Sequence, residues 1–410
     1  MRTHFTPSQL CDPHLADAEA NLRTCVHCGI CTATCPTYVL TGDERDGPRG
    51  RIVMIQQMLE EGGAPSAQAV HHIDRCLSCL ACRTACPSSV DYSRLVDTAR
   101  AHIHRRYRRP MRERVLRWLI AKVLTRPRLI RAALPFAKLG RVLRGRLGAM
   151  ARMGANIHAD TPRDTSPKLK APALRAALVQ GCVQSVLAPH IDGAIARVLA
   201  RRGIETVPIA GCCGALVHHL GREAEAKNFA RRMIEAFEQS GCDVVMIGAS
   251  GCSAHLRDIA HLFADEPARL ARAQAFAAKA RDFLELADAR ARLTASFTVA
   301  WQAPCSLQNG VRLADKGRRL LVDCGFDVRE PKESHLCCGS AGTYAILQPD
   351  LANALRERKR VQLAAQSAHA IASANIGCLQ HLSGPGLPPF VHLAELVDWA
   401  DGGAKPDALR

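Results

Sequence analysis

Eight of the 19 cysteines in this 410-residue chain fall into two runs with the same spacing. The first run is Cys25-x-x-Cys28-x-x-Cys31-x-x-x-Cys35-Pro36, and the second has its cysteines at positions 76, 79, 82 and 86, followed by a proline. Three thiolates separated by two-residue gaps can surround one face of a [4Fe–4S] cubane, while the fourth points elsewhere. In bacterial ferredoxins a run of this kind gives its fourth cysteine to the other cluster. The spacing therefore predicts two [4Fe–4S] clusters.

Crossed ligation takes three cysteines for each cluster from one run and the fourth from the other. The first cluster is expected on Cys25, Cys28, Cys31 and Cys86, and the second on Cys76, Cys79, Cys82 and Cys35. The alternative is structural zinc, which prefers two separated pairs of ligands. A four-cysteine run that ends in proline favours iron–sulfur clusters over zinc.

Eight further cysteines form two sets in the C-terminal part of the chain. They are Cys182, Cys212, Cys213 and Cys252 in the first set, and Cys305, Cys337, Cys338 and Cys378 in the second. Matching cysteines are 123 (182 to 305), 125 (212 to 337) and 126 (252 to 378) positions apart. This nearly constant offset indicates an internal duplication. Each set contains Cys-Cys-Gly, which predicts a tight turn whose glycine tolerates a positive φ.

Three functions are open for these two sets of cysteines. They are a further metal cluster, a redox-active dithiol, or a thiolate-lined site for an electron acceptor. The alternative is that they are small packing residues at strand ends, or a site that has lost its metal. Because free cysteines are usually kept for reactivity rather than packing, we favour a functional role.

Helices are expected to position the first eight cysteines. One is predicted over residues 12–24, where Leu15, Ala18 and Leu22 share a face. A second follows residue 51 and stops at Gly62-Gly63, and a third leaves the second run from about Tyr92. This is more helix than a minimal ferredoxin contains. We therefore expect residues 1–99 to form an all-α domain that holds both clusters.

Strands alternate with helices in the duplicated part. The predicted strands cover residues 174–180, 205–209 and 243–247 in one copy, and 296–301, 326–330 and 369–374 in the other. Such alternation predicts parallel sheets covered by helices, with the cysteines just past the carboxyl ends of the strands, where α/β sheets form ligand crevices. The predicted fold is thus α+β and multidomain, with one α/β Cys-Cys-Gly repeat over residues 174–290 and a second over 291–410.

The net charge of +17 is concentrated in residues 100–152, which hold 17 Arg or Lys and one acid, Glu113, so +16 lies there and about +1 elsewhere. Prolines 110, 127 and 135 are predicted to divide this segment into short amphipathic helices. Such an arm fits either an anionic membrane surface or packing on protein with its arginines solvated. Nucleic acid is disfavoured because only 4% of residues are aromatic. Residues 153–173 are expected to be a linker.

Composition bounds the remaining possibilities. An apolar content of 48% is ordinary for a globular protein. The sequence shows no apolar signal segment and no run of 18 apolar residues, which predicts a cytoplasmic protein or one on the cytoplasmic face of a membrane. Cysteines in such a chain point to metal chemistry rather than disulfides. No G-x-G-x-x-G opens a helix, so no dinucleotide site is expected.

The two runs followed by two Cys-Cys-Gly repeats resemble the iron–sulfur subunits of glycolate oxidase (glycolate dehydrogenase) along nearly the whole chain. The resemblance includes Cys25-Val-His-Cys28-Gly-Ile-Cys31, Asp46-Gly-Pro-Arg-Gly-Arg-Ile52 and His335-Leu-Cys-Cys-Gly-Ser-Ala-Gly-Thr-Tyr344. More distantly the chain is similar to a heterodisulfide reductase subunit, an anaerobic glycerol-3-phosphate dehydrogenase subunit and a lactate-utilisation protein. In heterodisulfide reductases the repeats can hold noncubane clusters and end in CxxC, whereas here both end in CxxH, at His255 and His381.

The resemblance implies that this chain carries electrons away from a flavoprotein that oxidises glycolate to glyoxylate. It implies two [4Fe–4S] clusters here, flavin only on a partner, and two partners: an FAD-linked oxidase subunit and a further flavoprotein-like subunit. The acceptor would be quinone-linked, and the basic arm would hold the complex on the inner face of the cytoplasmic membrane.

Two rival functions remain. The same relay could serve lactate, another 2-hydroxy acid or glycerol 3-phosphate. A non-redox module, with zinc as a staple and the arm on nucleic acid, is disfavoured by the cysteine spacing.

Overall fold

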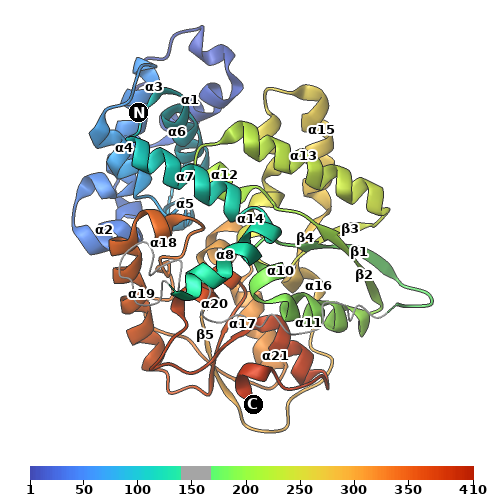
Figure 1. The fold of residues 1–410 in the computed structure, drawn as a ribbon. Coiled ribbons are helices and arrows are strands. Elements are labelled where there is room, and N and C mark those ends of the chain that lie inside the picture. Colours follow the sequence, from blue (N-terminus) through green and yellow to red (C-terminus); the bar gives the residue numbers. More distant parts are fainter. Residues whose placement is uncertain (140–167) are drawn as a thin grey trace.

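The computed structural model describes residues 1–139 and 168–410, and it forms a helix-rich α+β fold. In Figure 1 the N-terminal helices (blue) lie beside repeat 1 (green to yellow), and repeat 2 (orange to red) lies beneath both. Two helices of the basic segment, α7 (Met111–Val123) and α8 (Pro127–Leu139), run across the front. The domain boundary predicted between residues 99 and 100 falls inside a helix, because α6 (Tyr92–Arg106) passes through both residues without a break.

The N-terminal part is built almost wholly of helices around the two cysteine runs. Asp12 caps the first helix by accepting hydrogen bonds from the backbone of His14 and Leu15, and Pro36 and Pro48 each begin a helix, where their missing N–H costs nothing. The elements are η1 (Gln9–Cys11), α1 (Pro13–Thr24), η2 (Ile30–Thr32), α2 (Pro36–Thr41), η3 (Glu44–Asp46), α3 (Pro48–Glu61), α4 (Ala67–Asp74), α5 (Ala81–Thr84) and α6 (Tyr92–Arg106).

Helices α1, α3, α4 and α6 bury a common core. Leu22, Ile55, Leu59 and Leu95 are almost completely inaccessible to solvent. The face predicted from the sequence for α1 therefore points inward, although Leu15 is only partly buried. Gly62, at φ +66°, ends α3 as expected. This core fixes both cysteine runs, because each run joins two of these helices.

Repeat 1 contains a four-stranded parallel sheet in the order β2-β1-β3-β4. The register pairs Leu178 with Pro208 and with Met246. The strands are β1 (Leu174–Gln180), β2 (Ile204–Ala210), β3 (Val244–Ile247) and β4 (Ala280–Asp282). The helices are α10 (Gln184–Leu187), α11 (Pro189–Ala200), α12 (Ala215–His219), α13 (Glu223–Ser240), α14 (Ser250–Arg257), η5 (Ile259–Phe263), α15 (Pro267–Lys279) and α16 (Phe283–Leu286).

Repeat 2 has the same topology, with the parallel order β6-β5-β7-β8. The strands are β5 (Thr298–Trp301), β6 (Asp327–Arg329), β7 (Ala370–Ser373) and β8 (Phe390–His392). The helices are η6 (Ser306–Gly310), α17 (Ala314–Asp323), α18 (Tyr344–Leu347), α19 (Pro349–Ala364), α20 (Ile376–Leu382), α21 (Leu393–Ala400) and η7 (Asp407–Leu409). All six predicted strands, three in each copy, are present. The sequence analysis missed the fourth strand of each sheet, and both are only three residues long.

The two repeats share one hydrophobic core rather than standing apart. Leu178 of β1 and Trp301 of β5 belong to the same buried cluster, with α11 and α21 packed between the sheets. Asp398 of α21 accepts hydrogen bonds from Arg197 and Arg201 of α11 at 2.7 and 2.6 Å. Because the two repeats share this core, the strand ends of one repeat and the cysteines there keep a fixed position relative to those of the other.

The basic segment forms helices, but not all of its arginines are solvated. Helix α7 (Met111–Val123) follows Pro110, and α8 (Pro127–Leu139) continues through Pro135, so that proline does not begin a new helix. The expectation of solvated arginines is wrong for Arg109 and Arg117, which both bind Asp74, at 2.6 and 2.7 Å. The end of the arm (140–152) and most of the expected linker (153–167) lie outside the described residues.

Candidate iron–sulfur and cysteine-rich sites

The structure brings the fourth cysteine of the second run to the first three cysteines of the first run. Cys25, Cys28, Cys31 and Cys86 line one small cavity, which we call the first cavity. Burial, followed by the proximity of Cys86, Cys25 and Cys28, raises the pKa of the Cys31 thiol to about 11. Cys28 is exposed, so the first cavity lies at the surface. This grouping is the one that crossed ligation requires.

The remaining four cysteines line a second cavity beside the first. Cys35 joins Cys76, Cys79 and Cys82 there, and the last of these also lines the first cavity. Cys35 and Cys76 are only 7% and 8% exposed. Burial also raises the pKa of the Cys79 and Cys82 thiols well above the usual value. The two cavities therefore share a wall, and the second is the more deeply buried.

The spread of the sulfur atoms suits clusters better than single ions. Within the described residues, the only group of three or more ligand atoms lying within 4.8 Å of one another is Asp43, Asp46 and His72. A tetrahedral zinc site at Zn–S distances of about 2.3 Å needs its sulfurs closer than that. In any three cysteines around either cavity, at least one pair of sulfurs is therefore farther apart than one zinc ion would hold it.

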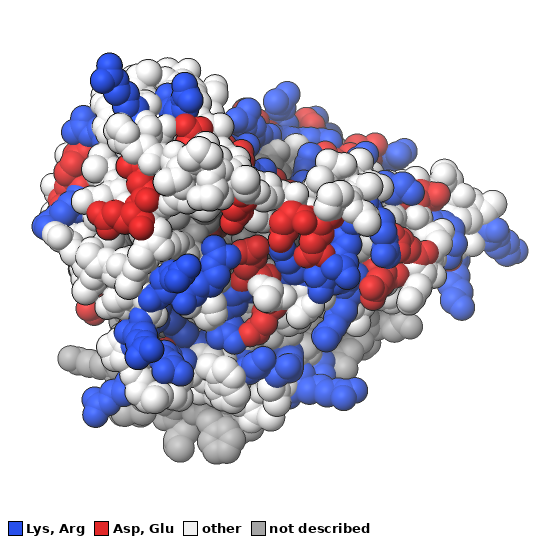
Figure 2. All heavy atoms as spheres, turned by 90° about the horizontal axis from the view of Figure 1, so that it is seen from above, with Lys and Arg blue, Asp and Glu red and all other residues white. Residues whose placement is uncertain are grey.

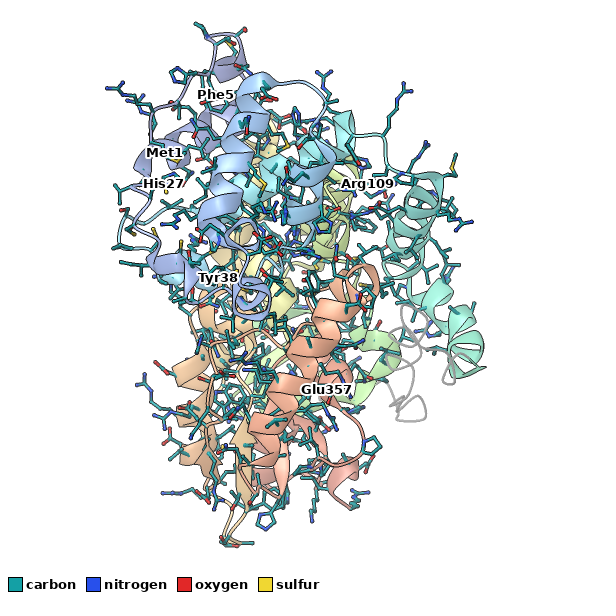
Figure 3. All side chains as sticks on the ribbon, turned by 90° about the vertical axis from the view of Figure 1, so that its left-hand side faces the viewer. Met1, Phe5, His27, Tyr38, Arg109 and Glu357 are labelled. Carbon is teal, nitrogen blue, oxygen red and sulfur yellow. The ribbon has the colours of Figure 1, made fainter. Side chains whose placement is uncertain are left out.

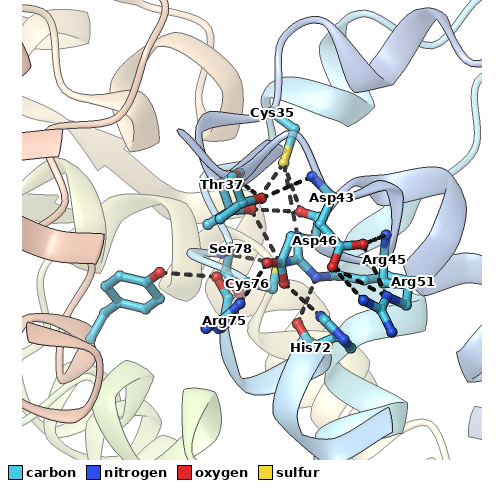
Figure 4. Close-up of polar contacts among 12 residues, drawn as sticks. Cys35, Thr37, Asp43, Arg45, Asp46, Arg51, His72, Arg75, Cys76 and Ser78 are labelled. Carbon is cyan, nitrogen blue, oxygen red and sulfur yellow. Dashed lines mark hydrogen bonds and ion pairs between the residues drawn. The ribbon is translucent and has the colours of Figure 1, made fainter. Parts of the chain in front are cut away.

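A buried polar network supports the second cavity (Figure 4). Asp46, which is fully buried, contacts His72 Nδ1 at 2.8 Å and accepts a hydrogen bond from Arg75 at 2.7 Å. Arg51, 1% exposed, donates to the His72 carbonyl at 2.7 Å and to Thr37 Oγ1 at 3.1 Å. Its third nitrogen lies 3.8 Å from Cys35 Sγ. The network ties three segments of the chain to one cysteine.

The surroundings of the first cavity are more open. In Figure 3, Met1 and His27 lie near each other at the edge of the molecule, and the Met1 amino group donates to the Cys25 carbonyl at 2.9 Å. Val26 and Ile30 are 67% and 54% exposed. Arg49 lines this cavity, but it is partly exposed and pairs with Glu44 at 2.6 Å. No comparable set of buried arginines surrounds the first cavity in the described part of the chain.

The cysteines of each repeat converge at the carboxyl ends of the strands, as predicted. In repeat 1, Cys213 Sγ lies 3.2 Å from Cys252 Sγ, and the neighbouring Cys182 and Cys213 raise the pKa of the Cys212 thiol well above its usual value. In repeat 2 the corresponding sulfur distances are 3.5 Å for Cys305–Cys337 and 3.4 Å for Cys338–Cys378. We call these sets the repeat 1 quartet and the repeat 2 quartet.

The predicted Cys-Cys-Gly turns are present in both quartets. Gly214 and Gly339 have φ values of +88° and +91°. A Cβ on Gly339 would approach the Ala352 carbonyl oxygen to 2.6 Å, so a side chain there would force α19 away. The glycine therefore allows the backbone to turn while α19 stays close to the cysteines.

A central cavity of about 440 Å³ opens between the repeats and the N-terminal helices. Seven of the eight quartet cysteines line it, the exception being Cys212. Cys79 of the second run lines it too. Asn309 of repeat 2 donates to the Cys79 carbonyl at 2.9 Å, and Tyr344 donates to the Arg75 carbonyl at 3.1 Å. The second cavity is thus in direct contact with repeat 2.

The two quartets differ in the groups around them. His381 Nε2 contacts the Ala352 carbonyl at 3.3 Å, whereas His255 Nε2 has no hydrogen-bond partner among the described residues and lies beside His218, with ring centroids 5.3 Å apart. Lys359, 3% exposed, stands near the repeat 2 quartet and donates to the Glu333 carbonyl at 2.7 Å. Its pKa is lowered by burial, which the nearby cysteines partly offset.

Comparisons with known proteins agree with this architecture. Residues 21–90 match a family described as a 4Fe-4S dicluster domain, and residues 176–257 and 299–383 each match a Cysteine-rich domain. The glycolate oxidase iron-sulfur subunit of Escherichia coli (strain K12) is 37% identical over 98% of this chain and 99% of its own length. The chain belongs to this family.

Two further relatives extend the comparison. The probable glycolate oxidase iron-sulfur subunit of Bacillus subtilis (strain 168) is 30% identical over 94% of this chain and 95% of its own length. A lactate utilization protein A of Exiguobacterium sp. is also 30% identical, over 54% of this chain and 96% of its own length. Membership of the glycolate oxidase iron–sulfur subunit family gives this chain an iron–sulfur electron-transfer role in an oxidoreductase.

Among residues 1–139 and 168–410, no helix combines the length and apolarity needed to cross a bilayer.

Sequence reasoning missed the buried charged residues of the site. Asp46 and Arg51 were noted only as part of a segment that resembles the family, and Arg100 only as part of the basic segment. In the structure Arg100 is 7% exposed and donates to Ser78 Oγ and to the Cys76 carbonyl, at 2.5 and 2.6 Å. For Asp46 and Arg51 the one signal in the sequence was their position, because both lie in the segment that connects the two cysteine runs.

Proposed function

We propose that this chain is the electron-transfer subunit of a glycolate dehydrogenase complex. A partner flavoprotein oxidises glycolate to glyoxylate, and electrons pass through two [4Fe–4S] clusters in this chain to a quinone-type acceptor. One observation carries the path: the three cavities are joined through shared cysteines. Cys82 lines the first and second cavities, and Cys79 lines the second and central cavities.

In this proposal the first cluster is held by Cys25, Cys28, Cys31 and Cys86, and the second by Cys35, Cys76, Cys79 and Cys82. The protein's part is to hold the clusters and to adjust their potentials through hydrogen bonds, charge and burial. Electrons enter at the first cavity, because Cys28 is exposed there and Val26 and Ile30 offer an apolar surface for a partner. They leave through the second cavity, which faces repeat 2.

The quartets receive electrons next, as the acceptor site or as further carriers. Their position supports this, since seven of their sulfurs face one cavity large enough for a small organic molecule. The deciding measurement is iron and acid-labile sulfide per chain on anaerobically purified protein, with EPR after dithionite reduction. About eight irons would leave the quartets as thiol or acceptor sites. A larger content, with a signal lost in Cys338→Ser, would make repeat 2 a carrier itself.

The substrate of the partner is tested with the whole complex. The chain is purified with its FAD-linked oxidase subunit and a further flavoprotein-like subunit, and cluster reduction is followed after adding glycolate, lactate or glycerol 3-phosphate. Fast reduction by glycolate supports the proposal. Fast reduction by lactate alone would favour the alternative suggested by the lactate utilization relative. Zinc in place of iron would refute the relay altogether.

We further propose that the basic helices hold the complex on the anionic inner face of the cytoplasmic membrane. Met111, Val115, Trp118 and Leu119 of α7 are exposed along one side of the helix. Exposed arginines accompany them, at positions 108, 112 and 114. Basic side chains are also plentiful on the face shown in Figure 2. Apolar and basic groups on one helix suit the interface of an anionic bilayer.

Vesicle binding tests this location. The chain should sediment with vesicles that contain anionic lipid and much less with zwitterionic ones, and added salt should release it. Trp118→Glu with Leu119→Glu should weaken binding at least about tenfold, because two charges would enter the apolar layer. Val361→Glu, at a 66% exposed position on α19, is the control. Equal binding by all three proteins would refute the membrane role of α7.

A further inference from the structure

Three arginines belong to the second cavity and the polar network beside it, and one of them, Arg51, is almost completely buried. Arg51 and Arg75 share one carboxylate, Asp46, at 3.6 and 2.7 Å. Arg100 adds a third guanidinium, and both of its hydrogen bonds go to neutral groups on Ser78 and Cys76. Of these three, Arg51 is the most deeply buried, and one of its nitrogens lies 3.8 Å from the Cys35 sulfur.

The guanidinium of Arg51 is fixed from several sides (Figure 4). One nitrogen donates to the His72 carbonyl at 2.7 Å and another to Thr37 Oγ1 at 3.1 Å. Thr37 Oγ1 in turn lies 3.2 Å from Cys35 Sγ and donates to the Asp46 carbonyl at 2.7 Å. The third nitrogen therefore has little freedom, and it faces Cys35 Sγ at 3.8 Å. This N–H group therefore faces the sulfur, while the Thr37 hydroxyl gives its proton to the Asp46 carbonyl and holds Arg51 in place through its oxygen.

Such an arrangement has a direct electrostatic consequence for a bound cluster. A cubane with four thiolate ligands is negatively charged and gains a further negative charge on reduction. Hydrogen bonds to its sulfurs and a buried cation stabilise the reduced form more than the oxidised form, which raises the reduction potential. Burial strengthens the effect, since a buried charge is little screened by water or salt. The surroundings also fit the group, because the buried Arg51 shares Asp46 with Arg75 and would stabilise anionic thiolates beside it.

We propose that Arg51, held in place by Thr37, is a positioning residue that raises the potential of the second cluster above that of the first. The inference rests on the proposed function, in which both clusters carry electrons. Its consequence is a one-way preference: an electron that enters at the exposed first cavity moves on to the buried second cavity. At the first cavity Arg49 cannot act equally, because it is partly exposed and bound to Glu44.

The test is an EPR redox titration of the complete, iron-loaded chain and its Arg51→Gln variant. Loss of the charge and its N–H groups should lower the potential of the second cluster enough to change its reduction equilibrium about tenfold, or about 59 mV for one electron. The potential of the first cluster should not move, and it serves as a control within the same protein. The Cys28→Ser variant, which disturbs the first cluster, identifies which signal belongs to which cavity.

Two further variants separate charge from shape. Arg51→Lys keeps a cation and should shift the second potential less than Arg51→Gln does. Arg45→Gln is the matched control, because Arg45 lies on the same connection, is half exposed and pairs with Asp43 at 2.8 Å. This variant should leave both potentials unchanged.

Several outcomes would overturn the inference. Full iron content in Arg51→Gln with both potentials unchanged would do so, as would an equal shift of both clusters. If Arg51→Gln fails to bind iron, then Arg51→Lys and Thr37→Val decide, and no fall in the second potential in either one would overturn it. Potentials that do not change in the Arg51 variants would overturn this inference and leave the proposed relay intact. A wild-type protein without clusters would refute the relay itself.

Discussion

The two cysteine runs have the same spacing and occupy opposite environments. The first cavity lies at the surface, where Cys28 is exposed and Val26 and Ile30 are open to a partner. The second lies inside, where Arg51 and Asp46 are buried and repeat 2 covers Cys79. An exposed cluster can exchange electrons with another protein, and a buried one near fixed charges can be tuned in potential. Identical ligand spacing therefore does not imply equivalent roles.

The largest expected effect tests whether ligation is crossed. Cys86→Ser should damage the cluster of the first cavity, and Cys35→Ser the cluster of the second, although each residue belongs to the other run. In each variant the iron content should fall from about eight toward about four per chain. The measurement is iron analysis together with EPR. If Cys86→Ser instead removes the same signal as Cys76→Ser, each run holds its own cluster and the crossed assignment is wrong.

The next effect tests whether only the first cavity meets the partner. Val26→Glu with Ile30→Glu should slow reduction by the glycolate-oxidising partner about tenfold or more, because two charges would be buried at the contact. Iron content and the potential of the second cluster should stay as in the wild type. Val361→Glu on repeat 2 is the control, being equally exposed. Normal stopped-flow rates in the Val26/Ile30 variant would place the entry of electrons elsewhere.

A smaller effect is expected where the second cavity meets repeat 2. Asn309→Ala removes the hydrogen bond to the Cys79 carbonyl and one to Thr84, and Tyr344→Phe removes the bond to the Arg75 carbonyl. Each loss should lower the free energy of unfolding by about 1 kcal/mol. Transfer beyond the second cluster should slow a few-fold, while reduction of the first cluster stays unchanged. Slowing of both steps would show that these contacts support the whole N-terminal part instead.

The smallest effect contrasts buried carboxylates with and without a cationic partner. Asp46 lies among arginines. Burial raises the pKa of Asp192 to about 7, although the hydrogen bond that it accepts from Gln184 acts in the opposite direction and lowers this pKa. The folded state therefore holds a proton on Asp192 that the unfolded chain releases near pH 4. The stability from this group is complete at low pH and is lost as pH rises through about 7.

Thermal unfolding at several pH values checks this expectation. Asp192→Asn should unfold at a temperature a few degrees higher than the wild type at pH 8, and the difference should shrink toward pH 5. The Gln184 hydrogen bond can persist in the variant, because the amide oxygen of Asn also accepts. A constant difference across this pH range would show that the carboxyl group of Asp192 does not titrate as described.

Much of the fold could be read from the sequence where the signal is local. The predicted strand at residues 174–180 coincides with β1, and three cysteine landmarks were enough to reveal the duplication. Strands β4 and β8 escaped notice because three residues are too few to show a period. Pro135 was expected to break a helix, but α8 continues through it. The preference of proline for helix starts is a tendency that neighbouring residues can override.

The candidate site, too, could be predicted from the sequence only in part. The sequence by itself predicted which cysteines group together, because ligand spacing and a following proline are local properties of the chain. Only the tertiary structure decided that one group is exposed and the other buried. It alone brought Arg51, Asp46 and Arg100 to the second cavity and placed Cys79 against repeat 2. Burial and charge are set by everything that packs around a residue, and the segments that pack here lie far apart in the chain.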